Sequence, residues 1–365
     1  MRVIQIINHA GPGFGGAELL AARLHADLRS SGVDARLLAL GPCRCDGLAG
    51  AESLDARHLL DPRTLRRLDG WLRPRLRPGD LVHAHLFPTS LHVGLLRRSG
   101  RIRVPCVFTE HSTWNRRRDL ALGRWLDRRI YRGFDRVFAI SPATEAALLT
   151  TLPMLRGRTE VVTNGTLLRF TAPPDRSAAA LPLILSVGRL DAAKNHAAAL
   201  RALARLGDRP FRYAILGDGP ERGALEALAH ELGLAGRVQM PGHVADIEPW
   251  LRAAEILLMP SLWEGFGLAA VEAMNAALPV VAGDVAGLAD IVAPNGSDAP
   301  GAAGLLVPPR DTAAIAHALG RLLDDPALRR ALGRAGFARA PEYGKDRMTE
   351  RYIAAYRAVL EGESR

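Results

Sequence analysis

The sequence predicts an α/β protein with two domains, each built on a parallel β-sheet that helices cover. The chain has 365 residues, which is enough for two domains of ordinary size. Short apolar runs, typical of strands buried on both faces, alternate along it with helical patterns. Several of these runs end in glycine-containing turns, and parallel sheets collect their ligands at such carboxyl ends of strands.

The N-terminal half alternates strand and helix patterns from its start. Strands are expected at residues 3–7, 35–40, 81–85, 104–108 and 136–141, and helices at residues 19–28 and 65–76. A glycine-rich stretch at residues 11–16 joins the first strand to the first helix, and its backbone N–H groups could cradle a phosphate. Its spacing is not that of the dinucleotide-binding fingerprint, so taken alone it indicates little about function.

Two histidines fall at the ends of predicted strands in this half. His85 closes the strand at residues 81–85, and His111 follows the strand at residues 104–108. Both therefore lie where ligands collect in a parallel sheet. A histidine in such a place is more often a hydrogen-bonded structural group than part of a site, so position alone does not assign a function.

Residues 114–134 interleave apolar and arginine side chains and admit two interpretations. In the first, the stretch is a basic amphipathic helix that lies on anionic lipid. In the second, which is the commoner case, it is a domain helix whose apolar stripe faces the core while its arginines face water. Both interpretations hold if the first part of the stretch is a loosely packed surface segment and the second part is a helix of the domain core.

The C-terminal half repeats the alternation. Strands are expected from residue 183 to a Gly188-Arg189 end and at residues 211–216, 238–240, 256–259 and 280–282. Helices are expected at residues 221–232, 268–274, 312–323 and 347–360, and an alanine-rich helix is expected after His196. Arg189 and Lys194 bracket a short loop after the first of these strands. Two cations at a strand end can neutralise a diphosphate, although arginine and lysine are also common on any surface.

Residues 260–274 read Pro-Ser-Leu-Trp-Glu-Gly-Phe-Gly-Leu-Ala-Ala-Val-Glu-Ala-Met, a turn that leads into a helix. Gly265 and Gly267 allow the backbone to bend tightly and to approach a ligand. The start of the following helix would present unpaired N–H groups, which suit a phosphate. Glu264 and Glu272 could then hold hydroxyl groups of a phosphorylated sugar, or both could be solvent-exposed residues of an ordinary helix.

This stretch resembles the signature of family-four retaining glycosyltransferases of the GT-B fold, in which two glutamates flank a nucleotide sugar. The resemblance covers nearly the whole chain and is tightest from residue 183 to residue 306. It implies two Rossmann-like domains whose parallel sheets face an interdomain cleft. These are an acceptor-side domain at residues 1–170, a linker at 171–180, a nucleotide-sugar-binding domain at 181–340, and a segment at 341–365 whose helix crosses back to the first domain.

The resemblance also implies which residues form the site. His111, Arg189, Lys194 and Glu264 are expected to act on the transferred sugar and the diphosphate, and His85 is a weaker candidate on the acceptor side. The residues expected to bind the donor are Gly15, Gly16, Gly188, Gly217, Gly219, Gly242, His243, Gly265, Phe266, Gly267, Leu268 and Glu272. The chain departs from the family pattern at Ala286, where a glycine is usual, and at Asp290, where a glutamate is usual, so the role of that turn stays open.

The expected reaction is transfer of a hexose or N-acetylhexosamine, with retention, from a nucleotide-diphosphate sugar to a hydroxyl of a glycan, lipid-linked or small-molecule acceptor. The resemblance favours UDP over GDP and implies no cofactor besides this donor. No Asp-x-Asp pair follows a predicted strand, so we expect no metal site. Two alternatives remain, a nucleotide-sugar epimerase or hydrolase of the same fold, and a basic protein that binds nucleic acid or lipid.

The positive charge lies in the N-terminal half. Residues 1–170 carry 27 Arg and no Lys against 15 acidic residues, the remainder carries 21 basic against 23 acidic residues, and the net charge is +10. Three cysteines are too few for a disulfide framework, and no apolar stretch is long enough to span a membrane. We therefore expect a cytoplasmic protein that binds no nucleic acid and that contacts the inner face of the cell membrane peripherally through its arginine-rich domain.

Overall fold

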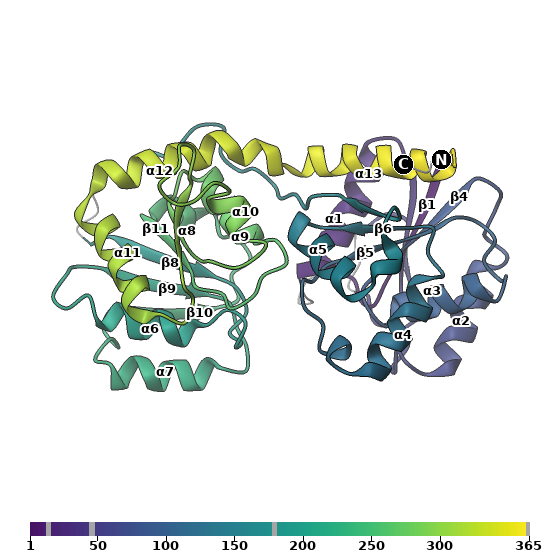
Figure 1. Cartoon of the computed structure of the whole chain (residues 1–365), viewed down its shortest axis with the longest axis horizontal. Coiled ribbons are helices and arrows are strands. Elements are labelled where there is room, and N and C mark those ends of the chain that lie inside the picture. Colours follow the sequence, from purple (N-terminus) through teal and green to yellow (C-terminus); the bar gives the residue numbers. More distant parts are fainter. Residues whose placement is uncertain (12–15, 44–47, 177–180, 363–365) are drawn as a thin grey trace. The chain divides into compact units, whose positions relative to one another are not determined.

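The computed structural model describes residues 1–11, 16–43, 48–176 and 181–362. The chain divides into two compact units, each with its own parallel sheet (Figure 1). Unit 1 comprises Met1–Asn164 together with Lys345–Arg365, and unit 2 comprises Gly165–Gly344. The division between the units thus falls six residues before residue 170, where the sequence analysis ends the first domain.

Unit 1 forms a sheet of seven parallel strands among its described residues, in the order β3-β2-β1-β4-β5-β6-β7. The strands are β1 (Arg2–Ile7), β2 (Asp34–Ala39), β3 (Ala51–Ser53), β4 (Asp80–His85), β5 (Cys106–Glu110), β6 (Arg136–Ala139) and β7 (Thr159–Val161). β1 pairs with β2 on one side and with β4 on the other. The winding therefore reverses between β1 and β4, which is the switch point of a doubly wound sheet.

Helices cover both faces of this sheet (Figure 1). They are α1 (Gly16–Ser30), α2 (Pro62–Leu72), α3 (Thr89–Arg98), α4 (Ala121–Tyr131), α5 (Pro142–Thr151) and α13 (Lys345–Leu360). Because successive side chains of a strand point to opposite faces, Ile4 and Ile6 of β1 join the core beneath α2, α3 and α4, whereas Ile7 joins the core beneath α1. α13 packs against α1.

Unit 2 forms a sheet of six parallel strands among its described residues, in the order β10-β9-β8-β11-β12-β13. The strands are β8 (Leu183–Val187), β9 (Arg212–Leu216), β10 (Val238–Gly242), β11 (Ile256–Met259), β12 (Val280–Gly283) and β13 (Gly304–Val307). The helices are α6 (His196–Ala204), α7 (Arg222–Glu231), α8 (Glu248–Ala253), α9 (Leu268–Asn275), α10 (Ala289–Val292), α11 (Thr312–Asp324) and α12 (Pro326–Arg339). Here the winding reverses between β8 and β11.

The predicted fold class, α/β with two parallel sheets, is confirmed. Several elements were not among those expected, namely β3, β7, β13, α3, α5, α8, α10 and α12. β5 begins at Cys106 and ends at Glu110, two residues later than expected at both ends, so His111 follows the strand directly. Within the described parts of the chain, no helix has the length and apolar character needed to cross a membrane.

Candidate functional site

The candidate site of unit 2 lies at the carboxyl ends of β8 and β11. These strands pair in parallel, so both chains leave the sheet at the same edge. Arg189 and Lys194 lie in the loop after β8, and Glu264 lies in the loop after β11. This edge is the switch point of the sheet, where open α/β sheets leave room for a ligand.

An ion pair joins the two loops. Lys194 Nζ lies 2.5 Å from Glu264 Oε2, and the two side chains are only 20% and 17% exposed. Nearby, the Leu262 N–H donates to the Ala193 carbonyl over 2.8 Å. The structure therefore brings together two residues that the sequence analysis treated as separate ligands, one for the diphosphate and one for the sugar.

Asn195 fixes the shape of the loop after β8. Its φ of +56° is left-handed, a conformation that asparagine tolerates better than most residues. Its Nδ2 donates to the Pro260 carbonyl over 3.1 Å and to the Pro309 carbonyl over 2.7 Å. Asn195 thus ties this loop to those after β11 and β13, a function that its position next to Lys194 did not reveal.

Arg189 differs from Lys194 in its surroundings. Its side chain is 71% exposed, and its Nε lies 3.8 Å from Asp191 Oδ2, a loose ion pair. A side chain held so weakly can reorient toward an anionic ligand at little cost, because an exposed pair at this distance contributes little free energy.

The glycines after β8 and β9 are required by close backbone contact. A Cβ on Gly217, whose φ is +147°, would lie 1.9 Å from the carbonyl oxygen of Gly188. A Cβ on Gly219 would lie 2.3 Å from the Leu190 carbonyl oxygen. The Gly217 N–H in turn donates to the Gly242 carbonyl over 2.8 Å. These predicted donor-binding glycines therefore have a structural function, since they allow three successive strand-end loops to touch.

α9 begins directly after the turn at Gly265 and Gly267. Gly267 has a left-handed φ of +88° and precedes Leu268, the first residue of the helix. The first N–H groups of a helix have no partner within it and carry the positive end of the helix dipole. The loop from Glu264 to Leu268 therefore places a carboxylate and a set of backbone donors side by side.

Two of the predicted donor-binding side chains have partners inside unit 2. Phe266 is 3% exposed and packs edge to face on Tyr343, with ring centroids 5.7 Å apart. Its backbone, rather than its ring, is thus the part that can face a ligand. Glu272 Oε1 accepts a hydrogen bond from Thr166 Oγ1 over 3.0 Å. Thr166, which the sequence analysis did not single out, orients one oxygen of this carboxylate.

Gly287 completes the site from the turn whose role the sequence left open. Its φ is +90°, and a Cβ there would lie 2.5 Å from the Glu264 carbonyl oxygen and 3.0 Å from that of Gly265. The turn after β12 therefore packs on the backbone of the glutamate loop. His243, also among the predicted residues, is exposed just after β10, whereas Gly242 is buried.

In unit 1, the structure brings His85 and His111 together. His85 Nδ1 lies 3.2 Å from His111 Nε2, at the ends of β4 and β5. Burial lowers the pKa of His85 well below its ordinary value and lowers the pKa of His111 to about 4, so both rings are neutral at pH 7. Gly16 is the exposed first residue of α1, and Gly15 lies outside the described residues.

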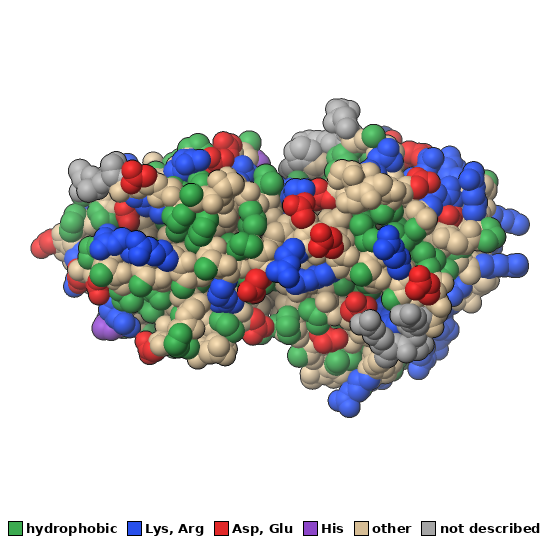
Figure 2. All heavy atoms as spheres, turned by 90° about the horizontal axis from the view of Figure 1, so that it is seen from above, with side chains coloured by type: hydrophobic (Ala, Val, Ile, Leu, Met, Phe, Trp, Pro, Cys, Tyr) green, Lys and Arg blue, Asp and Glu red, His purple; other side chains and the backbone are tan. Residues whose placement is uncertain are grey.

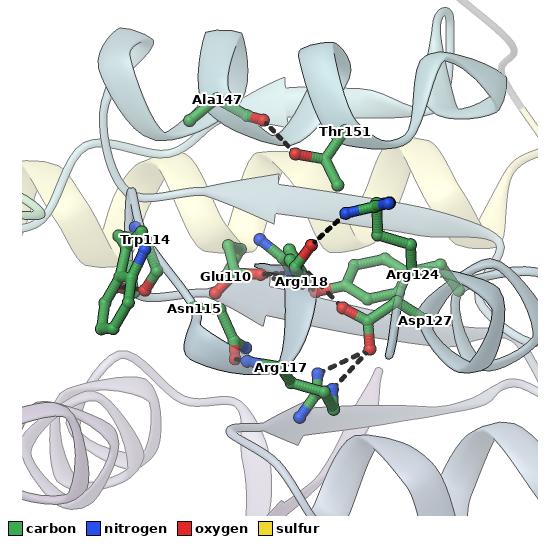
Figure 3. A network of polar contacts seen from close by, with 11 residues as sticks. Glu110, Trp114, Asn115, Arg117, Arg118, Arg124, Asp127, Ala147 and Thr151 are labelled. Carbon is green, nitrogen blue, oxygen red and sulfur yellow. Dashed lines mark hydrogen bonds and ion pairs between the residues drawn. The ribbon is translucent and has the colours of Figure 1, made fainter. Parts of the chain in front are cut away.

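The arginine-rich stretch at residues 114–134 combines parts of both interpretations. Arg118 is buried, where its Nε donates to Asp127 Oδ2 over 2.8 Å and its Nη2 to Glu110 (Figure 3). Tyr131 donates to Glu110 Oε2 over 2.6 Å. The expectation that the arginines all face water is therefore wrong for Arg118, because two buried carboxylates hold it inside.

The expected apolar stripe of this stretch is also divided. Ile130, Tyr131 and Phe134 are buried, as expected of a core helix. Leu120, Leu122 and Trp125 are instead 67%, 73% and 49% exposed. The inner side of α4 is occupied by Gly123 and Asp127, which turns these larger apolar side chains outward.

The family profiles and relatives that match this chain together cover nearly all of it. The profile of "Glycosyltransferase Family 4" matches residues 14–168, and that of "Glycosyl transferases group 1" matches residues 174–339. A D-inositol 3-phosphate glycosyltransferase from Kribbella flavida is 30% identical over 362 residues, which cover 90% of this chain and 82% of that protein. A 2-deoxystreptamine glucosyltransferase from Streptomyces kanamyceticus is 39% identical over 184 residues, 49% of this chain and 46% of that protein.

Solved structures agree on the fold. Sucrose-phosphate synthase from Thermosynechococcus elongatus matches with a TM-score of 0.84 at 24% identity, over 100% of both chains. HepE from Anabaena, in complex with UDP and glucose, matches with a TM-score of 0.84 at 19% identity, over 98% of this chain and 100% of that one. Together with the profiles and the Kribbella relative, these matches show that the chain belongs to the group 1 glycosyltransferases of family 4, which have the GT-B fold.

Proposed function

We propose that this glycosyltransferase moves a hexose or N-acetylhexosamine from a nucleotide-diphosphate sugar to a hydroxyl group of its acceptor, with retention and without a metal ion. The observation that carries the proposal is the Lys194–Glu264 pair beside the start of α9. It places a cation, a carboxylate and helix N–H groups at one strand edge. Those are the groups needed to hold a diphosphate and the hydroxyls of the sugar attached to it.

The chemistry follows from the leaving group. When the bond between the anomeric carbon and the diphosphate oxygen breaks, negative charge develops on the diphosphate. Arg189, Lys194 and the N-terminus of α9 stabilise that charge, which is the main source of catalysis in such a transfer. The acceptor oxygen bonds to the anomeric carbon on the same face, and its proton goes to the leaving phosphate. No side chain of the chain is therefore assigned as base.

UDP is the favoured nucleotide, and a small polyol is the favoured acceptor. HepE, a structural neighbour, has been solved with UDP and with UDP-glucose. The names of the relatives specify D-inositol 3-phosphate and 2-deoxystreptamine as acceptors of those enzymes. Both acceptors carry several hydroxyl groups on one ring, so they are suitable first probes, beside the glycan and lipid-linked acceptors that the sequence analysis names.

We also propose that the protein is cytoplasmic and contacts an anionic membrane through α4. Leu120, directly before α4, and Leu122 and Trp125 within it are exposed, and the Arg129 guanidinium lies 4.3 Å from the centre of the Trp125 ring. Apolar side chains interleaved with arginines suit the interface of an anionic bilayer. Lys and Arg side chains also gather on the face of unit 1 (right) that Figure 2 draws, so the positive charge of this unit is not confined to α4.

A transfer assay tests the proposed reaction. Full-length protein is incubated with UDP- and GDP-sugars, each with and without D-inositol 3-phosphate or 2-deoxystreptamine, in EDTA. We expect transfer from an α-linked donor to give an α-linked product, read from the anomeric proton coupling. A β-linked product excludes retention, a need for added divalent metal excludes metal independence, and a new sugar formed without acceptor indicates an epimerase.

Arg189→Ala supplies the matched variant for this assay. Loss of one cation that stabilises the diphosphate should lower kcat by roughly 10²–10³-fold. Arg201→Ala, at an exposed arginine of α6 in the same unit, should leave kcat unchanged. Near-full activity of Arg189→Ala would be strong evidence against the assigned diphosphate site.

A further inference from the structure

Three histidines lie close together in unit 1, His83 within β4, His85 at its end and His111 directly after β5, and they have different partners. His83 Nδ1 lies 2.7 Å from Tyr356 Oη of α13, and its Nε2 lies 2.7 Å from Thr109 Oγ1 of β5. Both ring nitrogens of His83 are thus engaged in structural hydrogen bonds. His85 instead contacts His111, the residue expected at the transferred sugar.

The contact between His85 and His111 allows two arrangements of one proton. Burial keeps both rings neutral at pH 7, so each ring has one donor and one acceptor nitrogen. Either His85 Nδ1 donates to His111 Nε2, or His111 Nε2 donates to His85 Nδ1. In the first arrangement His111 carries its proton on Nδ1, and in the second on Nε2.

The side chain of Gln5 distinguishes between these two arrangements of the proton. Its Nε2 lies 3.5 Å from His85 Nε2, and its Oε1 has no partner among the described residues. An amide N–H₂ can only donate, so His85 Nε2 accepts and the proton of His85 is on Nδ1. Turning the amide over would move both N–H donors away from this contact to the place where Oε1 has no partner, so the placed orientation is the one that uses a donor of the amide.

We propose that His85 is a positioning residue that holds His111 in the Nδ1–H tautomer, so that His111 offers a hydrogen-bond donor to a hydroxyl of the transferred sugar. The inference takes the role of His111 at the sugar from the family resemblance and so rests on the proposed function, but the tautomer itself does not. His85 is suited to this task because it is 1% exposed and its ring lies against that of His83, with centroids 3.9 Å apart and the ring planes tilted by 41°. A buried ring that contacts His83, Gln5 and His111 has little freedom to turn its donor away from His111.

With these contacts at both ring nitrogens, His85 does not bind the acceptor. Its Nδ1 is bonded to His111 and its Nε2 faces Gln5, so no ring nitrogen is left for an acceptor. A positioning residue changes the rate through the geometry of His111, and its replacement by a side chain with a donor at the same place should restore function.

Substitutions at His85 distinguish the two ring nitrogens. Asparagine places its amide nitrogen near the position of His85 Nδ1, and glutamine places it near that of Nε2. His85→Asn should therefore keep His111 in the Nδ1–H form and hold kcat within about threefold of the wild type. His85→Gln and His85→Phe should lower kcat by roughly five- to tenfold, the effect expected from loss of one neutral hydrogen bond.

Two-bond ¹H–¹⁵N spectra of the full chain, labelled with ¹⁵N-histidine, report the tautomer directly at pH 7.5. His111→Gln identifies the His111 signals, and His58→Asn, at an exposed histidine, serves as control. We expect an Nδ1–H ring for His111 in the wild type and in His85→Asn, and a mixture of tautomers in His85→Gln and His85→Phe. An Nε2–H ring in the wild type, or an unchanged His111 signal in His85→Phe, overturns the proposal.

The two readouts separate this inference from the proposed function. If no nucleotide sugar supports transfer but the spectra show the expected tautomers, the reaction assignment fails and the arrangement of His85 and His111 stands. If transfer occurs and His111 carries its proton on Nε2, the positioning role of His85 fails alone. If His85→Phe does not fold, the comparison of His85→Asn with His85→Gln decides.

Discussion

Lys194 and Glu264 form an ion pair that spans 70 residues of sequence and joins the loops after β8 and β11. Nζ and Oε2 are 2.5 Å apart, and both side chains are mostly buried. In the proposed function, a bound diphosphate would share Lys194 with Glu264, and sugar hydroxyls would bind the carboxylate. The two residues would then act as one unit, although they contact different parts of the donor.

A double-mutant cycle tests this coupling. Lys194→Met and Glu264→Gln should each lower kcat by roughly 10²–10³-fold, while the double variant should lose far less than the product of the two. The reason is that either single change already disrupts the shared pair. Arg209→Met and Asp324→Asn, which break an exposed ion pair of 2.9 Å in the same unit, provide a control cycle with no effect on kcat. Fully multiplicative losses would contradict the coupling.

Gly217 should tolerate no side chain. In Gly217→Ala the new Cβ would lie 1.9 Å from the Gly188 carbonyl oxygen, so the loops after β8 and β9 must separate. We expect the free energy of unfolding, measured by urea titration, to fall by about 1–3 kcal/mol, together with a loss of transfer activity. Gly223→Ala is the matched control, because a Cβ there meets no atom within 4 Å and α7 favours alanine. Equal stability of both variants would rule out this explanation of the glycine.

Arg118 should be essential for the stability of unit 1. Arg118→Leu would leave the carboxylates of Glu110 and Asp127 buried without this cation. Breaking a buried ion pair in this way costs about 3–5 kcal/mol of unfolding free energy. Arg128→Leu, at an exposed arginine of α4 in the same unit, should change stability by less than about 0.5 kcal/mol. If thermal unfolding finds the two variants alike, the network in Figure 3 is not stabilising.

The exposed side chains of α4 should carry membrane binding. In flotation with vesicles rich in phosphatidylglycerol at low salt, the wild type should rise with the lipid, and high salt should release it. Leu122→Ser combined with Trp125→Ser should weaken binding by roughly tenfold or more, because two apolar side chains are no longer buried. Leu60→Ser, at a leucine that is 61% exposed elsewhere in unit 1, is the control. Wild-type protein that stays at the bottom of the gradient disproves the contact.

Local patterns predicted the fold class and the strand ends, and the family resemblance indicated which residues at those ends form the site. β11 has the bounds that its apolar run indicates, and α9 begins at Leu268, directly after the glycine turn. Strand ends in a parallel sheet share one edge, so Arg189, Lys194 and Glu264 were expected to lie near each other. The bounds of each strand and helix depend on residues that are close in sequence, so a periodic pattern can predict them.

The partners of the site residues could not be predicted, because they depend on contacts between distant segments. Thr166 bonds to Glu272 across 106 residues, and Gly287 packs on the Glu264 backbone from a turn that departs from the family pattern. Arg118 was expected in water because hydrophobic periodicity treats every arginine as polar. Its burial depends on Glu110 and Asp127, whose positions only the folded chain defines.

The stability of unit 2 should fall in acid because of His196. This residue is 2% exposed at the start of α6. Burial, followed by the nearby charge of Lys194, lowers its pKa from 6.5 to about 4. Between these two values the unfolded chain binds a proton that the folded chain does not, so stability is lost as the pH falls through this window and is unaffected by His196 above it. By pH 4 the loss amounts to about 3 kcal/mol.

His196→Leu removes the titrating group and should flatten this dependence. We expect a urea midpoint close to that of the wild type at pH 8. At pH 5 the variant should be more stable than the wild type by about 2 kcal/mol, because only the wild type has an imidazole that is protonated in the unfolded chain and neutral in the folded one. His230→Leu, at an exposed histidine of α7, controls for the change of side chain. If wild type and His196→Leu lose stability in parallel from pH 8 to pH 5, protonation of His196 is not what destabilises the unit, and a different buried group must be responsible.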